Sequence, residues 1–342
     1  MLEAWANIDL YVPLSRIPEE ARRIEALGYD VLSVPDLVHD GIAAAALAIQ
    51  ATERIRVTNT ALIAFPRSPM VVAVAAWDLQ ESSGGRYSLG LGPQVRGNII
   101  QRFSTPWTPP APRMRDYVQA IRAIFACWQD GVPLDYHGEH YTFTKMQPYT
   151  SPRPLPFERM PIRLAGIGAQ MTALAGELAD GLHTHPTSAC PRTLREHVRP
   201  HLERGAARTG RQAEDVRIVA NPLCATGPDA ATVASQREEQ RQLLATLLST
   251  PSYWPSLDLH GWRDRGETLY GMVREGRWDE LGSVVNDEML DVMVPQAPYA
   301  ELPDLLAERY RGLAHGVTFP LPADPKDDAL IARAIARFKD VS

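Results

Sequence analysis

Residues 8–34 read IDLYVPLSRIPEEARRIEALGYDVLSV, and this stretch indicates the class of fold. Ile8 to Val12 is short and apolar, which is typical of a buried strand. Pro18 to Leu27 has the apolar spacing of a helix, and Gly28 ends it. Tyr29 to Val34 is again apolar and β-prone. A strand, a helix and a strand in this order predict a parallel βαβ unit.

The same alternation recurs along the chain and gives eight strand–helix units, which is the count of a (β/α)8 TIM barrel in the α/β class. The expected strands are 8–12, 29–34, 55–65, 87–91, 162–165, 181–185, 216–225 and 317–321. The expected helices are 18–27, 42–51, 70–80, 114–128, 171–179, 193–208, 230–248 and 327–338. An open doubly wound sheet is the alternative, but it normally has a glycine-rich turn after its first strand. Here Val12-Pro13-Leu14-Ser15 follows, without glycine, so the barrel is favoured.

Two segments interrupt the rhythm of a single domain that covers residues 1–342. Residues 129–160 are rich in proline and contain a hairpin signal at 136–141, after the fourth strand. Residues 249–298 are expected to form short helices before the eighth strand. In barrels, insertions after strands often cover the catalytic mouth, although a surface elaboration or a dimer contact explains them equally well.

The overall composition excludes several classes of protein. The chain has 342 residues, 45% of them hydrophobic, and a formal net charge of -6. This acidic balance argues against nucleic acid as a partner. The three cysteines are far apart, which suits a reducing compartment. Because we find no signal peptide and no apolar run long enough to span a membrane, we expect a cytoplasmic protein without membrane contact.

Two glycine motifs follow expected strands. Gly166-Ile167-Gly168-Ala169-Gln170-Met171 lies between a strand and a helix, where free backbone N–H groups can bind an anion such as phosphate. The same residues also suit an ordinary βα turn. Gly90 and Gly92 end the fourth strand, where the absence of side chains lets a flat ring lie close to the backbone.

Polar side chains near other strand ends are candidates for catalysis. Asp36 and His39 follow the second strand, and a histidine there can move a proton near neutral pH. A solvated loop histidine is an equally good interpretation. His183 and His185 lie at the end of the sixth strand, but no third ligand or supporting carboxylate is evident, so we expect no metal.

Several stretches together resemble one family. Gly28-Tyr29-Asp30 before Val34-Pro35-Asp36, and Ser83-Gly84-Gly85-Arg86-Tyr87-Ser88-Leu89-Gly90-Leu91-Gly92, resemble signatures of the luciferase-like monooxygenases. Arg113, Asp116 and Tyr117, the hairpin around Gly138-Glu139-His140-Tyr141, and the segment from Ala165 to Gly181 are also similar. The similarity extends over nearly the whole chain and is greatest to the deazaflavin-dependent oxidoreductases of actinobacteria.

The resemblance implies a cofactor, an oligomer and a set of binding residues. The cofactor is coenzyme F420, a deazaflavin, or alternatively FMN, and the oligomer is a homodimer. In deazaflavin-dependent relatives a non-prolyl cis peptide bulges toward the ring, and by position it falls near Leu62-Ile63. The implied cofactor-binding residues are Leu62, Ile63, Gly90, Gly92, Gly166, Gly168, Ala169, Gln170 and Met171.

The catalytic pattern of the family is only partly present. Relatives often have Asp-His after the second strand, whereas here Asp36-Leu37 stands there and His39 comes later. Several relatives have a glutamate after the fourth-strand glycines, where this chain has Pro93-Gln94. We therefore take His39, Asp36 and Gln94 as the catalytic candidates, with His39 handling the proton.

Three functions compete. The first is hydride transfer between the deazaflavin and a small organic substrate, because a deazaflavin has carbon in place of the flavin N5 and reacts poorly with oxygen. The second is an FMN-dependent monooxygenase, supplied with reduced flavin by a partner reductase. The third is a flavin-binding barrel without catalytic activity, which the missing glutamate makes conceivable.

Overall fold

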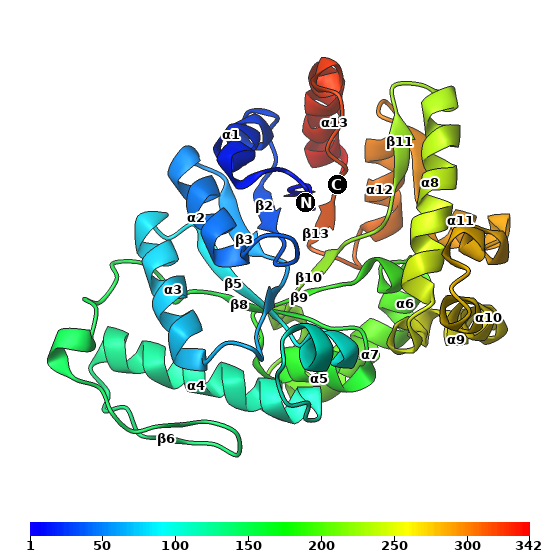
Figure 1. Cartoon of the computed structure of the whole chain (residues 1–342). Helices are drawn as coiled ribbons and strands as arrows, with labels where there is room; N and C mark the ends of the chain where they lie inside the picture. The colour runs from blue at the N-terminus through cyan, green and yellow to red at the C-terminus, as the bar shows by residue number, and fades with distance from the viewer.

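The computed structural model describes all 342 residues, and its centre is a closed barrel of eight parallel strands (Figure 1). Each strand pairs with its neighbours in chain order, and β13 pairs with β1 to close the ring. The barrel strands are β1 (Glu3–Asn7), β2 (Val31–Val34), β3 (Arg56–Asn59) with its continuation β4 (Leu62–Ile63), β5 (Tyr87–Gly92), β8 (Ile162–Ala165), β9 (Gly181–His183), β10 (Arg217–Ala220) and β13 (Gly316–Thr318). The predicted (β/α)8 fold is therefore confirmed.

Helices surround this ring and bury one face each against it. They are α1 (Ile17–Ala26), α2 (Gly41–Ala51), α3 (Pro69–Ser82), α4 (Pro110–Asp130), α5 (Ala169–Leu178), α6 (Pro191–Thr193), α7 (Arg199–Ala207), α12 (Leu302–Tyr310) and α13 (Asp328–Val341). Most of their buried residues and those of the strands form one continuous core of 69 residues.

Both predicted insertions are present. After β5 and α4, the hairpin β6 (Tyr136–His137) and β7 (Thr142–Phe143) lies against α4. It is held there by Asp116, which is buried in α4 and accepts hydrogen bonds from the Tyr136 hydroxyl and from the backbone N–H groups of His140 and Tyr141. In the sequence, Asp116 was noticed only through the family resemblance. Its buried carboxylate has a structural role, because it holds the hairpin against α4.

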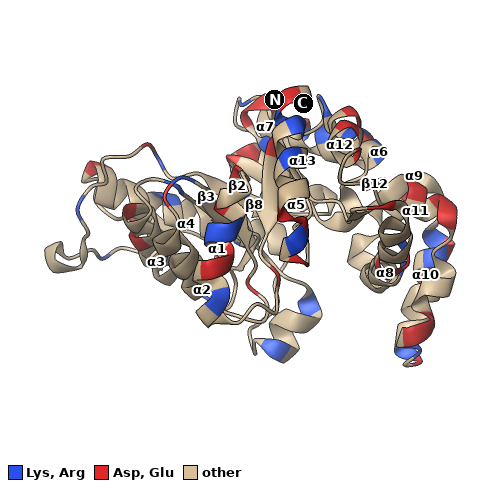
Figure 2. Cartoon of the chain, turned by 90° about the horizontal axis from the view of Figure 1, so that it is seen from above, with Lys and Arg blue, Asp and Glu red and all other residues tan.

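The second insertion forms a lobe beside the barrel (Figures 1 and 2). It comprises β11 (Ala225–Gly227), α8 (Ala230–Leu248), α9 (Pro255–His260), α10 (Arg263–Arg274), α11 (Asp287–Met293) and β12 (Gln296–Pro298). These elements share their own core of 15 buried residues. Counting residues 230–248 as a barrel helix was wrong, because Leu244, Ala245 and Leu248 of α8 belong to this second core and α12 covers the barrel instead.

Three strand assignments were also wrong in their bounds. The first strand is Glu3–Asn7 and not residues 8–12, because pairing with β2 and β13 outweighs the weak β-propensity of its alanines. Residues 55–65 form two strands, separated at Thr60–Ala61. Residues 216–225 also divide, since β11 leaves the barrel and pairs with β12.

The surface matches the composition. Basic and acidic residues are interspersed along the helices in the view of Figure 2. None of the helices combines the length and the apolarity that a bilayer crossing requires.

Candidate functional site

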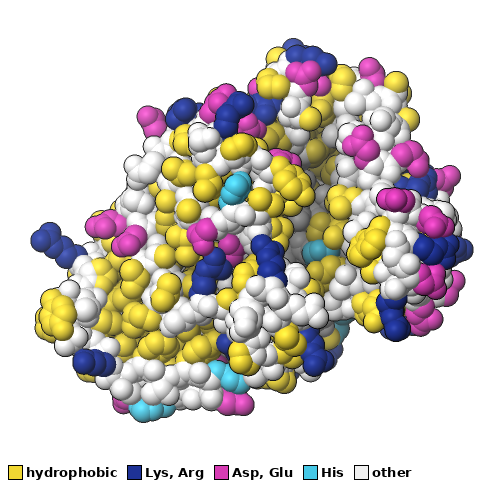
Figure 3. Space-filling model, viewed as in Figure 1, with side chains coloured by type: hydrophobic (Ala, Val, Ile, Leu, Met, Phe, Trp, Pro, Cys, Tyr) yellow, Lys and Arg dark blue, Asp and Glu magenta, His cyan; other side chains and the backbone are white.

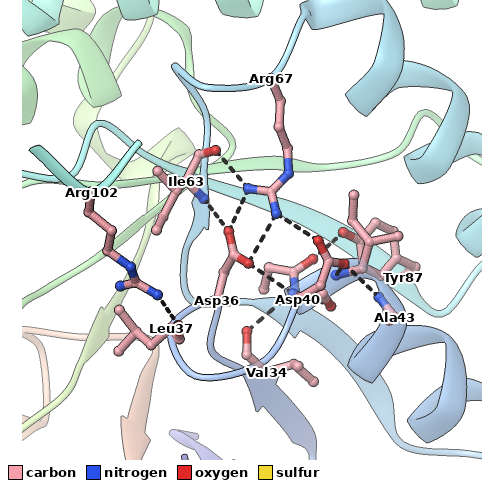
Figure 4. Close-up of polar contacts among 12 residues, drawn as sticks. Val34, Asp36, Leu37, Asp40, Ala43, Ile63, Arg67, Tyr87 and Arg102 are labelled. Carbon is pink, nitrogen blue, oxygen red and sulfur yellow. Dashed lines mark hydrogen bonds and ion pairs between the residues drawn. The ribbon is translucent and has the colours of Figure 1, made fainter. Parts of the chain in front are cut away.

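The carboxyl ends of the barrel strands form a mouth, and its first wall is the loop after β2. Asp36 in this loop is only 5% exposed. One carboxylate oxygen accepts from the N–H of Gly41 at 2.9 Å, and the other accepts from the N–H of Ile63 at 2.8 Å. The Arg67 guanidinium contacts both oxygens, at 3.2 and 2.7 Å (Figure 4). Four donors use the lone pairs that a carboxylate offers, so Asp36 links α2, β4 and the loop that leads into α3.

Arg67 extends this network to the helix that follows. Its guanidinium also binds Asp40 at 2.8 Å, and Asp40 caps α2 by accepting from the N–H groups of Ile42 and Ala43. Burial opposes the charge of Arg67, yet hydrogen bonds and charge from Asp36 and then Asp40 raise its pKa. On the other side of the loop, Arg102 donates to the carbonyl of Leu37 (Figure 4). The loop is thus fixed on both sides.

His39 lies on this fixed loop, and its side chain is half-buried. The imidazole makes no hydrogen bond with any other group of the chain, in contrast to Asp36 three residues before it. A histidine that is held in place by its backbone and free at its ring nitrogens can exchange a proton with a bound molecule. His39 remains the predicted proton carrier, and the geometry leaves both of its ring nitrogens available.

The next wall is the break between β3 and β4, where the peptide bond between Thr60 and Ala61 is cis. It lies just ahead of Leu62-Ile63, the position that the family resemblance indicates. Leu62 and Ile63 pair with Leu91 and Gly92 of β5, and their own side chains are 0% and 3% exposed. Only the backbone of this segment can therefore face a ligand.

Gly90 and Gly92 fit closely against this break. A Cβ on Gly90 would lie 1.9 Å from the carbonyl oxygen of Asn59, and one on Gly92 would lie 3.1 Å from the Cβ of Ala61. The glycines therefore let the irregular segment approach β5. Gln94 follows with φ +60° and is half-buried, and its side-chain oxygen accepts from the N–H of Val95 at 2.8 Å.

The adjoining wall contains the start of α5, which follows β8, the strand that pairs with β5. Gly166 is required by close packing, since an added Cβ would lie 2.9 Å from the Cβ of Met171. Gly168 begins the helix, and an added Cβ there would meet nothing within 4 Å. No side chain caps this end, as is also the case for α1, α4, α7, α10, α12 and α13, whereas Asp40, Ser68, Asp229 and Asn286 cap α2, α3, α8 and α11. The N–H groups of Ala169, Gln170 and Met171 lack helical partners and can bind an anion.

The two histidines after β9 have different environments. His183 points into the barrel against Trp5, with ring centroids 5.6 Å apart, and burial together with the Arg163 charge lowers its pKa to about 3. His185 lies at the mouth, where its ring packs on Tyr253 with centroids 4.2 Å apart. Tyr253 comes from the second insertion, and no sequence signal marked it. No three His, Cys, Asp or Glu side chains are grouped to hold a metal ion.

Residues 3–316 match the family described as luciferase-like monooxygenase. The chain belongs to this family. An uncharacterised protein of Mycobacterium tuberculosis is 38% identical over 304 residues, which cover 89% of each chain.

Solved structures share the family fold at lower identity. The coenzyme F420-dependent tetrahydromethanopterin reductase from Methanopyrus kandleri superposes with a TM-score of 0.82 at 17% identity, over 100% of this chain and 99% of that chain. The EDTA monooxygenase from Chelativorans sp. superposes with a TM-score of 0.71 at 14% identity, over 96% and 86%. Similarity at these identities establishes the barrel and is compatible with either cofactor.

Proposed function

We propose that this protein is an oxidoreductase that transfers a hydride between coenzyme F420 and a small organic substrate. The observation that carries the proposal is the mouth itself, where Gly90 and Gly92 let the segment between β3 and β4 pack closely on β5, one strand away from the uncapped start of α5. The first suits a flat ring and the second suits a phosphate. A homodimer completes the proposal, and we expect it to use the apolar face on which Val71 and Val74 are 57% and 44% exposed.

The residues of the mouth divide the work of binding. Gly90, Gly92 and the backbone of Leu62-Ile63 would hold the ring, and the N–H groups at Ala169 to Met171 would hold the phosphate. When bound, a deazaflavin supplies a carbon atom that takes or gives a hydride. His39 would move the accompanying proton at a ring nitrogen. The apolar side chains around the mouth would exclude water from the transfer.

The alternative is an FMN-dependent monooxygenase that receives reduced flavin from a partner reductase. It is favoured by the similarity to the EDTA monooxygenase, whose fold is shared over 96% of this chain. A barrel that binds a flavin without catalysis is the third possibility, because Gln94 stands near the position where relatives have a glutamate. We rank F420 first because the F420-dependent reductase superposes with the higher TM-score, 0.82.

The test is a pair of binding titrations of the purified full chain, one with F420 and one with FMN, followed by cofactor fluorescence. The proposal expects F420 to bind more tightly. Binding of FMN alone would favour the monooxygenase. Absence of binding by both cofactors would overturn the assignment of the mouth as a cofactor site.

A further inference from the structure

The His183-Thr184-His185 motif, noticed in the sequence as a possible ligand set, contains one side chain that the proposed chemistry has not used. His185 lies two residues beyond the end of β9, on the face of the barrel where the strands end. The turn Pro186–Ser188 follows it directly, and the elements of the second insertion pack against that turn. His185 therefore lies between the barrel and the insertion. The space-filling view shows a groove between these two parts of the molecule (Figure 3).

The hydrogen bonds of His185 favour one tautomer. Its Nδ1 accepts from the backbone N–H of Thr187 at 3.4 Å and lies 2.9 Å from the Thr187 hydroxyl. A backbone N–H can only donate and the Thr187 hydroxyl can donate as well, so these contacts favour an unprotonated Nδ1, with the proton of the neutral ring on Nε2. Protonating Nδ1 would break this capping bond. The ring is thus a directed N–H donor whose Nε2 has no partner in the chain.

The surroundings hold the ring neutral and in place. Burial lowers the pKa of His185 to about 4, and no charged neighbour contributes to the shift. Tyr253, half-buried in the insertion, packs its ring against the imidazole at 4.2 Å and 37°. An anion in such a place would need a cation that is absent there. A neutral oxygen that accepts a hydrogen bond is the group that this donor suits.

We propose that the Nε2–H of His185, supported by the ring of Tyr253, binds an uncharged carbonyl or hydroxyl oxygen of the substrate. This inference rests on the proposed function, since it names the class of molecule that meets the cofactor in the mouth. His185 acts as a binding and orienting residue, and the proton of the reaction is left to His39. The second insertion then contributes directly to specificity through Tyr253.

Two substitutions separate this role from a structural one. His185→Asn keeps an oxygen where Nδ1 accepts from Thr187, so the turn stays capped, but it lacks the Nε2–H. His185→Gln reaches the Nε2 position with an amide N–H and loses the cap. A substrate-binding role predicts that His185→Asn binds the probe more weakly than the parent and that His185→Gln binds it nearly as well. A purely structural role predicts the reverse.

The probe is cyclohexanone, compared with methylenecyclohexane, which has the same shape without the oxygen. Binding to the full chain is measured by ligand-observed NMR, without cofactor and again with F420. We expect His185→Asn to weaken cyclohexanone binding roughly tenfold, as for one buried hydrogen bond, and to leave methylenecyclohexane unaffected. Tyr253→Ala should weaken cyclohexanone binding as well, while Tyr253→Phe, which keeps the ring, should not.

The outcomes distinguish the inference from the proposed function. The inference is overturned if the parent does not bind cyclohexanone or if His185→Asn binds it as tightly as the parent does. It is also overturned if His185→Asn and His185→Gln lose cyclohexanone binding equally. F420 fluorescence is measured on the same samples. Failure of the parent protein to bind F420 would refute the cofactor assignment. It would leave the cyclohexanone result standing, because that result is obtained without cofactor.

Discussion

The side of the mouth formed by β2 to β5 and the side formed by β8 and β9 differ in how they use their polar groups. On the first side, Asp36, Asp40 and Arg67 bond to one another and to the backbone, and Asn59 bonds to the Tyr87 hydroxyl at 2.5 Å and to the Gly41 carbonyl at 3.0 Å. On the second side, the start of α5 has no cap and His185 has a free N–H.

The two sides therefore have different roles: the first supports the structure of the mouth, and the second binds ligands. Buried polar groups that hydrogen-bond to one another rigidify a structure, whereas unpaired groups at an accessible mouth can hydrogen-bond to a ligand. The first side therefore acts mainly as a scaffold that shapes the backbone around Gly90 and Gly92. His39 is its exception, since its ring is free. The second side supplies donors for the phosphate and for the substrate oxygen.

The largest effect is expected from a substitution of His39, the polar side chain on the first side whose ring has no partner. His39→Ala should slow turnover about 10²- to 10⁴-fold, which is the usual contribution of a positioned acid–base group. Cofactor binding should change little, because the loop is held by Arg67 through Asp36 and Asp40 and by Arg102 through the Leu37 carbonyl. Steady-state rates and F420 titrations on the same samples check this. Unchanged turnover would remove His39 as the proton carrier.

The scaffold should respond in stability. Asp36→Asn removes the charge that pairs with Arg67 in a buried setting, and we expect the free energy of unfolding to fall by about 3 kcal/mol. Urea denaturation followed by circular dichroism measures it. Arg277→Ala, which breaks an exposed pair with Glu280, is the control and should change little. Equal effects of the two substitutions would contradict the scaffold role.

Packing between the break and β5 gives a smaller loss. Gly90→Ala places a Cβ against the Asn59 carbonyl, and overpacking of this kind costs about 1–3 kcal/mol. The shift of the backbone should also weaken F420 binding. In the control Gly97→Ala the new Cβ meets nothing within 4 Å. A stable Gly90→Ala variant with normal cofactor binding would show that the close approach is unimportant.

The binding side should respond in affinity without a loss of stability. Gly168→Val fits the cofactor-free chain, because its Cβ would meet nothing within 4 Å, but it would obstruct a phosphate at the helix start. We expect F420 binding to weaken about tenfold, or 1.4 kcal/mol, with unchanged thermal unfolding. Gly271→Val in α10 is the matched control, since that glycine is equally free of neighbours. Parent-like affinity would locate the phosphate elsewhere.

The sequence predicted most of the barrel because periodicity reports burial. The strand 162–165 and the hairpin at 136–141 lie where they were expected, and the family resemblance located the cis peptide to within a few residues. The start of the chain was misassigned because pairing, and not propensity, makes Glu3–Asn7 a strand. Nothing local to α8 distinguishes a barrel helix from one in a separate core.

The site was predictable only in part, because many contacts join residues far apart in the chain. Arg67 and Asp36 are 31 positions apart, and their pairing, which occupies the candidate carboxylate, has no local signature. Tyr253 meets His185 only after the insertion folds back on the barrel. The glycines were recognisable because close backbone approach leaves a local mark in the sequence.

The central claim is that this barrel transfers a hydride from a deazaflavin and does not activate oxygen. Stopped-flow mixing of the protein carrying reduced F420 with air-saturated buffer, and then with a carbonyl acceptor such as cyclohexanone, tests it most directly. We predict that the reduced cofactor persists in air and is oxidised when the acceptor is added. A rapid oxygen-dependent absorbance change with reduced FMN, accompanied by oxygen uptake and an oxygenated product, would contradict the claim and identify a monooxygenase.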